Sequence, residues 1–168
     1  MRTLLLLRHA KSDWSADYGH DHDRPLNKRG RRAASDLGRW LRLTGEVPDL
    51  VVCSTATRAR DTVERAMQAG QWACPTLLDE RIYSADGRRV AKLIRTFDDS
   101  ASRILVAGHE PGIATALSLL LGRAPVRFPT AAIARIDLQV KCWKQVRPGV
   151  GSLVWFVPPR LIERAVID

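Results

Sequence analysis

The sequence predicts an α/β fold, a single three-layer domain with a mostly parallel central sheet of about six strands and helices on both faces. Apolar runs of strand length alternate along the chain with longer segments of helical periodicity. The first apolar run, residues 4–7, consists of four consecutive leucines, which is typical of a strand buried on both faces, as parallel strands are. A chain of 168 residues buries a sizeable core without disulfides, so we expect one domain over residues 1–168.

The first half of the chain contains two predicted strands, each followed by a helix. After the leucine strand, residues 12–25 form a polar loop. A helix is expected over residues 28–43, where apolar residues recur at helical spacing and Gly45 follows the end. Residues 48–53 are a second apolar run of strand type, and residues 54–57 supply capping side chains for the helix after it.

The second half continues this alternation and ends with two strands joined by a basic connection. Because that connection is hairpin-like, at least one of these two strands is expected to run antiparallel. Two prolines at 158–159 are expected to end regular structure, with a short helix or tail after them. The predicted elements are a weak strand at 75–78, a helix at 86–97, a strand at 103–107, a helix that begins at Pro111 with residues 113–121 as its apolar body, and strands at 131–138 and 151–157.

The chain is strongly basic, with 27 Lys and Arg against 18 Asp and Glu and a formal net charge of +9. Such a charge implies an affinity for anions without saying which anions. Much of the surplus falls in predicted helices, and no aromatic residues interleave with it as they do on a base-stacking surface. Nucleic acid is therefore not expected as the main partner.

The cysteines and the apolar segments indicate in which cellular compartment the protein is expected. Cys53, Cys74 and Cys142 are odd in number and widely spaced, which indicates neither a disulfide framework nor a zinc site. The leucine run lacks the flanks of a signal peptide, and no later segment approaches the roughly 20 apolar residues that cross a bilayer. We expect a cytoplasmic protein without membrane association and without a cofactor.

The loop over residues 13–23 is rich in Asp and His, a composition that could bind a metal ion. Side chains this closely spaced in a loop are more often solvated, so we expect no metal site here. We interpret the loop as a lid or rim over a crevice.

Polar residues follow the ends of three predicted strands. Arg8 and His9 come directly after the leucine run, Arg58 lies near the start of the helix after residues 48–53, and His109 follows the strand at 103–107. Ligands of open parallel sheets bind outside the carboxyl ends of the strands, so these side chains are expected to meet. Guanidinium forks suit the oxygens of a phosphoryl group, and a neutral imidazole is a nucleophile. The sequence therefore predicts a phosphoryl pocket.

The same residues carry a family resemblance. Arg8-His9, the stretch 54–62 and Gly108-His109-Glu110-Pro111 resemble, in order, the three signature segments of the histidine phosphatase (phosphoglycerate mutase-like) superfamily. The short chain and the segments 8–14 and 24–27 resemble its SixA-like phosphohistidine phosphatase subgroup. The resemblance implies one histidine phosphatase domain over residues 1–168 with a phosphoglycerate mutase-like fold.

The resemblance also implies roles for individual residues. His9 becomes phosphorylated, and water later releases phosphate. Arg8, Arg58 and His109 bind the phosphoryl oxygens, with His109 as a third cation if it is protonated. Ser12, in the first segment, is assigned to substrate binding.

An acidic residue after the second arginine is the implied proton donor. Glu80 is the best match, and Asp79 beside it stays open as an alternative. Ala10 stands where most of the superfamily has glycine, which we interpret as a mark of the subgroup.

We therefore expect a phosphatase that forms a covalent phosphohistidine intermediate on His9 and acts on protein phosphohistidine. Imidazole, with a pKa of about 6.5, leaves more easily than an alcohol, whose pKa of about 16 resembles that of water. Three alternatives remain: a phosphatase of small phosphomonoesters, a phosphoglycerate mutase-type transferase, and a non-catalytic anion-binding module. The partner is accordingly a phosphorylated protein or a small phosphorylated metabolite.

Overall fold

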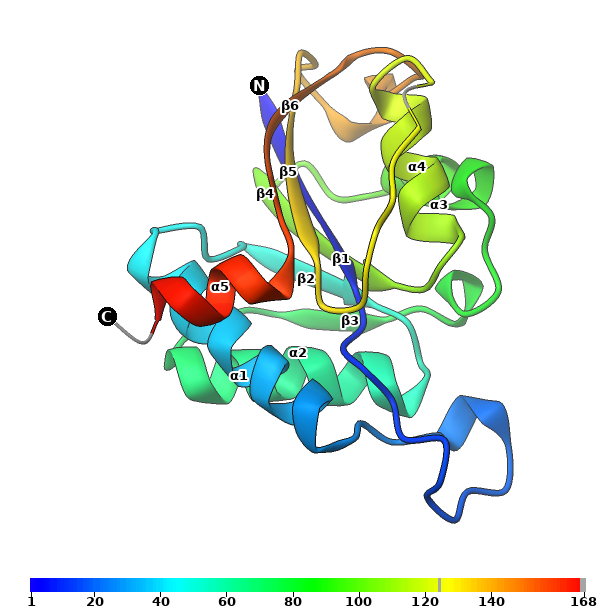
Figure 1. Cartoon of the computed structure of the whole chain (residues 1–168). Coiled ribbons are helices and arrows are strands. Elements are labelled where there is room, and N and C mark those ends of the chain that lie inside the picture. Colours follow the sequence, from blue (N-terminus) through cyan, green and yellow to red (C-terminus); the bar gives the residue numbers. More distant parts are fainter. Residues whose placement is uncertain (124, 167–168) are drawn as a thin grey trace.

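The central sheet of the computed structural model, which describes residues 1–123 and 125–166, has six strands in the order β3-β2-β4-β1-β5-β6 (Figure 1). Strands β1 to β4 run parallel, whereas β5 is antiparallel to both of its neighbours. This arrangement confirms the predicted α/β class and the antiparallel strand near the C-terminus. The strands are β1 (Arg2–Arg8), β2 (Leu50–Cys53), β3 (Thr76–Leu78), β4 (Arg103–Gly108), β5 (Ile133–Leu138) and β6 (Gly151–Val157).

Helices cover both faces of the sheet, as predicted. One face carries α1, α2 and α5, and the other carries α3 and α4 (Figure 1). No helix within the described residues is long and apolar enough to cross a membrane. The helices are α1 (Lys28–Leu43), α2 (Thr57–Gly70), α3 (Gly87–Ile94), α4 (Gly112–Leu120) and α5 (Pro159–Ala165), and the 3-10 turns are η1 (Asp21–Asp23), η2 (Glu80–Ile82) and η3 (Trp143–Gln145).

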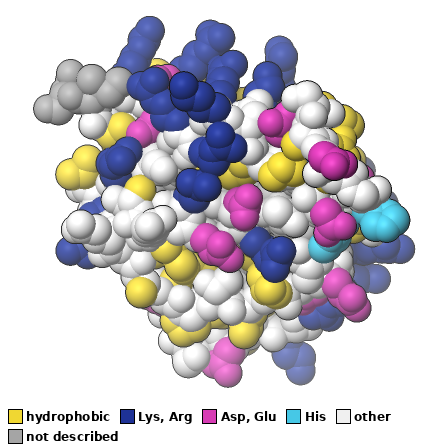
Figure 2. All heavy atoms as spheres, turned by 90° about the horizontal axis from the view of Figure 1, so that it is seen from below, with side chains coloured by type: hydrophobic (Ala, Val, Ile, Leu, Met, Phe, Trp, Pro, Cys, Tyr) yellow, Lys and Arg dark blue, Asp and Glu magenta, His cyan; other side chains and the backbone are white. Residues whose placement is uncertain are grey.

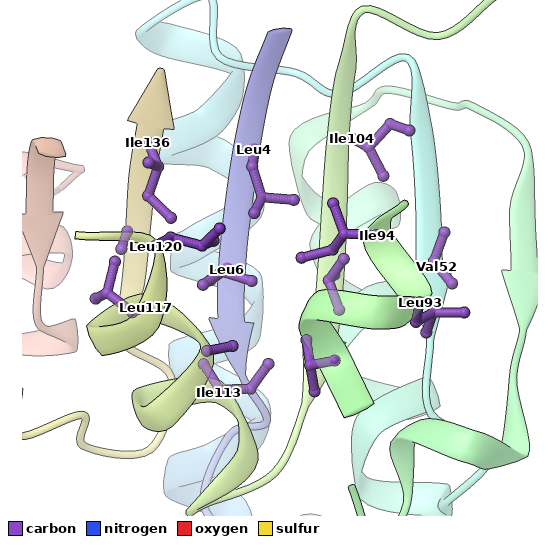
Figure 3. Close-up of a cluster of buried hydrophobic side chains, with 14 of the residues drawn as sticks. Leu4, Leu6, Val52, Leu93, Ile94, Ile104, Ile113, Leu117, Leu120 and Ile136 are labelled. Atoms are coloured by element: carbon purple, nitrogen blue, oxygen red, sulfur yellow. The ribbon is translucent and has the colours of Figure 1, made fainter. Parts of the chain in front are cut away.

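The four leucines of β1 form the centre of the core. Successive side chains of a strand point to opposite faces, so Leu4 and Leu6 pack under α3 and α4 (Figure 3), while Leu5 and Leu7 pack toward α1 and α2. None of the four is more than 1% exposed. Burial on both faces is the reason why this strand has no polar alternation.

Most boundaries differ from the sequence prediction by one or two residues, and three differences have a clear structural reason. The N-cap of α2 is Ala56, because the Ser54 hydroxyl instead accepts from the Ala56 N–H (3.3 Å) and bonds a histidine elsewhere. Helix α3 ends at Ile94, and the chain after it continues in i→i+3 turns. Pro159 begins α5 rather than ending regular structure, since a proline is well placed in the first turn of a helix.

The parallel strands end level with one another. Arg8 pairs with Gly108, and Cys53 pairs with Ala107, so β1, β4 and β2 finish side by side. Whatever follows these three strands is therefore held at one edge of the sheet.

Helices α1 and α2 approach each other closely through small residues. A Cβ atom at Gly38 would collide with the backbone of Ala66, and one at Gly70 would collide with the carbonyl of Gly38. The Gly38 carbonyl also accepts a hydrogen bond from the Trp72 indole (3.2 Å). The face of the sheet that carries α1 and α2 depends on this contact.

We expect Gly38→Ala to lower the free energy of unfolding by about 2 kcal/mol, because the new methyl group forces the two helices apart. Urea unfolding followed by circular dichroism measures the change. Gly19→Ala is the matched control, since nothing lies within 4 Å of a Cβ at Gly19. Equal stability of the two variants would contradict the close packing of α1 on α2.

Candidate active site

A cavity of about 370 Å³ opens at the sheet edge where β1, β2 and β4 end. The structure brings together the four side chains expected there from the sequence, and the ring centroids of His9 and His109 are 5.0 Å apart. Strand order explains the meeting, because β4 lies between β1 and β2. The cavity is lined by Arg8, His9, Lys11, Ser12, Trp14, Arg24, Arg29, Arg58, His109, Glu110 and Thr130.

His9 directly follows β1 and is buried. Its backbone N–H donates to the Gly108 carbonyl (3.0 Å), which holds it beside β4. The Nδ1 atom of its ring lies 2.7 Å from the Ala10 carbonyl oxygen. A carbonyl oxygen only accepts, so Nδ1 carries the hydrogen and Nε2 keeps the lone pair. The ring thus has one nitrogen held by the backbone and the other available for attack.

Ala10 is held in place by a backbone hydrogen bond and by packing of its methyl group. Its N–H donates to the Thr62 hydroxyl (3.0 Å), and that hydroxyl donates to the carbonyl of Arg58 (2.6 Å). The first turns of α2 are therefore tied to the segment that orients His9. The methyl group that replaces the glycine of the superfamily pattern packs in a small apolar cluster with Leu26, Ala34 and Ala131.

The surroundings of His9 keep its imidazole neutral. Burial lowers the pKa of His9 to about 4, and the positive charges of Arg58, Arg8 and Arg24 act in the same direction. The hydrogen bond to Ala10 opposes them only in part. A neutral ring at pH 7 is the form that can act as a nucleophile.

His109 follows β4 and is also buried. Burial, together with the nearby His9 ring and the charge of Arg58, lowers its pKa to about 3. The ligand-free ring is thus neutral at pH 7, and the expected third cation is absent in this state. The Nε2 atom lies 2.8 Å from the Ser54 hydroxyl, while Nδ1 is buried without a hydrogen-bond partner among the described residues.

Two arginines reach the cavity with hydrogen-bonding capacity to spare. Arg8 donates from Nη1 to the Phe128 carbonyl (2.7 Å), and Arg58 donates from Nη1 to the Asp21 carbonyl (2.7 Å). Within the described part of the chain, the buried Nε atoms of both arginines have no partner. An unpaired buried donor costs about 1–3 kcal/mol, so an anion that accepts from these groups is favoured.

Arg24 is a site residue that the sequence reasoning missed. It is 5% exposed and donates from Nη1 to the Ser12 hydroxyl (2.5 Å), and its guanidinium lies 3.5 Å from the ring centroid of Trp14. Ser12, expected to bind substrate, thus lines the cavity and also holds Arg24. Its segment, residues 24–27, resembles the SixA-like subgroup, but an arginine before Pro25 does not by itself distinguish a buried cation from a turn residue.

The Asp- and His-rich loop borders the cavity, where Trp14 lines it and Asp21 contacts two of its arginines. One carboxylate oxygen of Asp21 accepts from Arg24 (2.8 Å), and the other accepts from Arg58 (3.1 Å) and from the Tyr83 hydroxyl (2.9 Å). Burial raises the pKa of Asp21, but these partners outweigh it and the net shift is downward. Within the described residues, no group of three or more His, Cys, Asp or Glu side chains could hold a metal ion.

The structure does not bring the expected proton donor to the cavity. Glu80 begins η2 after the edge strand β3, is exposed, and is absent from the lining. The carboxylate of Asp79 forms an ion pair with the guanidinium of Arg81 (Oδ2 to Nη2, 2.6 Å). The lining carboxyl group belongs instead to Glu110, next to His109, which is also exposed; partial burial of its carboxyl raises its pKa, and the charge of Arg8 opposes the rise.

Comparison with known proteins identifies relatives over nearly the whole chain. The model of the histidine phosphatase superfamily (branch 1) matches residues 4–87. An uncharacterised protein of Mycobacterium tuberculosis is 38% identical over 164 residues, which cover 92% of this chain and 100% of the relative.

Solved structures have the same fold. SixA from Agrobacterium tumefaciens is 26% identical with a TM-score of 0.80, over 94% of this chain and 98% of the other. SixA from Nakamurella multipartitia is 30% identical with a TM-score of 0.77, over 94% and 96%. Both carry phosphohistidine phosphatase in their names.

The neutral histidines predict how stability depends on pH. The unfolded chain binds a proton at each imidazole near its ordinary pKa of about 6.5, whereas folded His9 and His109 bind one only near pH 4 and 3. The unfolded state therefore binds more protons between these values, and stability falls as the pH drops below about 6.5. Each histidine contributes a slope of about 1.4 kcal/mol per pH unit.

Urea unfolding of wild type, His9→Gln and His109→Gln between pH 7 and 5 checks this expectation. Each variant should show a shallower loss of stability below pH 6.5 than wild type. Identical slopes would mean that the two rings titrate alike in the folded and unfolded chains.

Proposed function

Because the chain belongs to the histidine phosphatase superfamily (branch 1), we propose that it hydrolyses protein phosphohistidine through a covalent phosphohistidine intermediate on His9. The single observation that carries this proposal is the hydrogen bond between His9 Nδ1 and the Ala10 carbonyl. That bond leaves Nε2 as a lone-pair donor inside a cavity lined by guanidinium groups. A phosphatase with a histidine nucleophile needs this combination.

In the first half-reaction, Nε2 of His9 attacks phosphorus and forms a new P–N bond. The bond between phosphorus and the substrate imidazole breaks, and its electron pair leaves with that imidazole, which takes up one proton from the solvent. Arg8, Arg58 and Arg24 bind the three equatorial oxygens, whose charge they stabilise in the transition state. His109 donates from Nδ1 to an oxygen while its Nε2 accepts from the Ser54 hydroxyl.

In the second half-reaction, water attacks the phosphorus on His9. The P–N bond breaks, inorganic phosphate leaves, and Nε2 recovers its lone pair. The proton released by water balances the one that the leaving imidazole took up. The net change is hydrolysis of one P–N bond.

The chemistry of the leaving group favours phosphohistidine as substrate. Imidazole, with a pKa of about 6.5, departs without a strong acid beside it. This matches a site in which Glu80 lies outside the cavity lining. The SixA relatives, with phosphohistidine phosphatase in their names, support the same substrate class.

A phosphatase of small phosphomonoesters is the second candidate, and Glu110 is the observation that favours it. An alcohol leaving group needs a proton, and Glu110 lines the cavity with a carboxyl pKa raised by burial. We propose Glu110, in place of Glu80, as the donor in any such side activity.

Phosphoryl transfer to His9 gives the first prediction of this function. Brief incubation with a ³²P-labelled phosphoryl donor, followed by a quench in alkali, should yield a label that is stable in alkali and lost in acid. His9→Ala should carry no label and lose at least about a thousandfold in kcat, because the nucleophile is gone. His20→Ala is the matched control, as this exposed histidine is absent from the lining. Label that persists in His9→Ala would exclude His9 as nucleophile.

The proton donor gives the second prediction. With an alkyl phosphomonoester, Glu110→Gln should lower kcat/KM by about a hundredfold, since general acid catalysis contributes on this order. With phosphohistidine the same change should have little effect, and Glu80→Gln should affect neither substrate. A loss confined to Glu80→Gln would return the donor role to Glu80.

A further inference from the structure

A second and larger hollow adjoins the active-site cavity. It lies between the N-terminal half of α1 and the C-terminal helix α5, and its volume of about 910 Å³ is more than twice that of the cavity. Lys11, Arg29 and Thr130 line both, so the two spaces adjoin. We call the larger one the basic groove. It is lined by Lys11, Lys28, Arg29, Arg32, Ala33, Asp36, Thr130, Pro159, Arg160, Glu163 and Arg164.

Positive charge dominates this groove. Arg32 forms ion pairs with Glu163 (2.9 Å) and Asp36 (3.8 Å), the two carboxylates of the lining. Lys11, Lys28, Arg29 and Arg160 are exposed, and none of them pairs with a carboxylate among the described residues. Figure 2, which views the molecule from below, shows Lys and Arg side chains crowded along the border where α5 lies.

The stability of the fold does not account for these charges. Lys28 and Arg29 are in the first turn of α1, which contains no acidic residue. The N-terminus of a helix is its positive end, so cations there are unfavourable by about 0.3–1 kcal/mol each. Residues that oppose local stability are typical of functional surfaces, where a ligand supplies the compensating charge.

We propose that the basic groove binds an acidic segment of a protein substrate, next to the histidine that carries the phosphoryl group. The inference rests on the proposed function, because it places the phosphohistidine in the cavity and the neighbouring residues of the same protein in the groove. Aspartate and glutamate side chains complement the exposed cations. Because Lys11 and Arg29 border both spaces, a polypeptide with its phosphohistidine in the cavity would have its neighbouring residues beside the groove.

Other anions fit the groove less well. No aromatic side chain lines it, so bases of a nucleic acid would have no stacking surface there. A second phosphate on a small metabolite would fill only a small part of its volume.

The test uses a double variant, Lys28→Glu with Arg160→Glu, which reverses two charges of the groove and touches no residue of the cavity lining. A carboxylate in the first turn of α1 is favourable for the helix, so the variant is expected to fold. The matched control is Lys144→Glu with Arg147→Glu. These exposed residues lie in the connection between β5 and β6, at the opposite end of β1 from the cavity.

Three substrates are compared at low salt: free phosphohistidine, a phosphohistidine peptide with three aspartates on each side, and the same peptide with asparagines. Wild type and the control variant should show a kcat/KM roughly tenfold higher for the aspartate peptide than for the asparagine peptide, through a lower KM. In the groove variant this ratio should fall to about one, while kcat/KM for free phosphohistidine stays unchanged. A ratio of one in wild type, or an equal loss in both variants, would overturn the proposal.

Failure of the proposed function would look different, since no phosphohistidine substrate would be hydrolysed at all. In that case, fluorescence anisotropy measures how tightly the unphosphorylated aspartate peptide binds, and this measurement tests the groove independently of catalysis. Weaker binding by the groove variant than by the control supports the proposal, and equal binding overturns it. An oligonucleotide is tested as a competitor as well. If it inhibits wild type at a lower concentration than the aspartate peptide does, and if the groove variant loses this inhibition, the proposal is overturned in favour of nucleic acid.

Discussion

The hydrogen bond between the His9 ring and the Ala10 carbonyl determines which imidazole nitrogen is available for reaction. Because the acceptor belongs to the backbone, the tautomer does not depend on the ionisation of any other side chain. The same short segment is anchored to α2 through Thr62, whose hydroxyl also bonds the carbonyl of Arg58. Orientation of the nucleophile and position of a phosphoryl-binding arginine are thus coupled through one threonine.

Electrostatics of the cavity follow from burial of several cationic or potentially cationic groups close together. Burial keeps the two imidazoles neutral, and the positive charge of Arg58 acts in the same direction on both. Asp21 offsets part of the excess positive charge by bonding both Arg24 and Arg58. Several buried N–H donors of the cavity have no acceptor among the described residues. The oxygens of a phosphoryl group are acceptors with negative charge, which explains why these donors are tolerated here.

Several cationic side chains meet at the edge of the sheet where the parallel strands end. The carboxyl ends of the parallel strands form the cavity, and α1 begins beside it after the rim loop. The proposed groove extends this positive region toward α5.

The sequence by itself determined the fold class, most of the elements and the four residues that meet in the cavity. These follow from local signals: the unbroken leucine run for a doubly buried strand, and polar residues directly after strand ends, which parallel pairing carries to one edge. The tertiary structure alone decided what depends on contacts between distant segments. Arg24 enters the site because Ser12 and Asp21 hold it, the tautomer of His9 depends on the local fold of the backbone, and Glu80 lies off the cavity because β3 is an edge strand. The spacing of residues along the sequence shows neither where a side chain points nor in which order the strands pair in a sheet. The position of Arg24, the tautomer of His9 and the position of Glu80 depend on these two features.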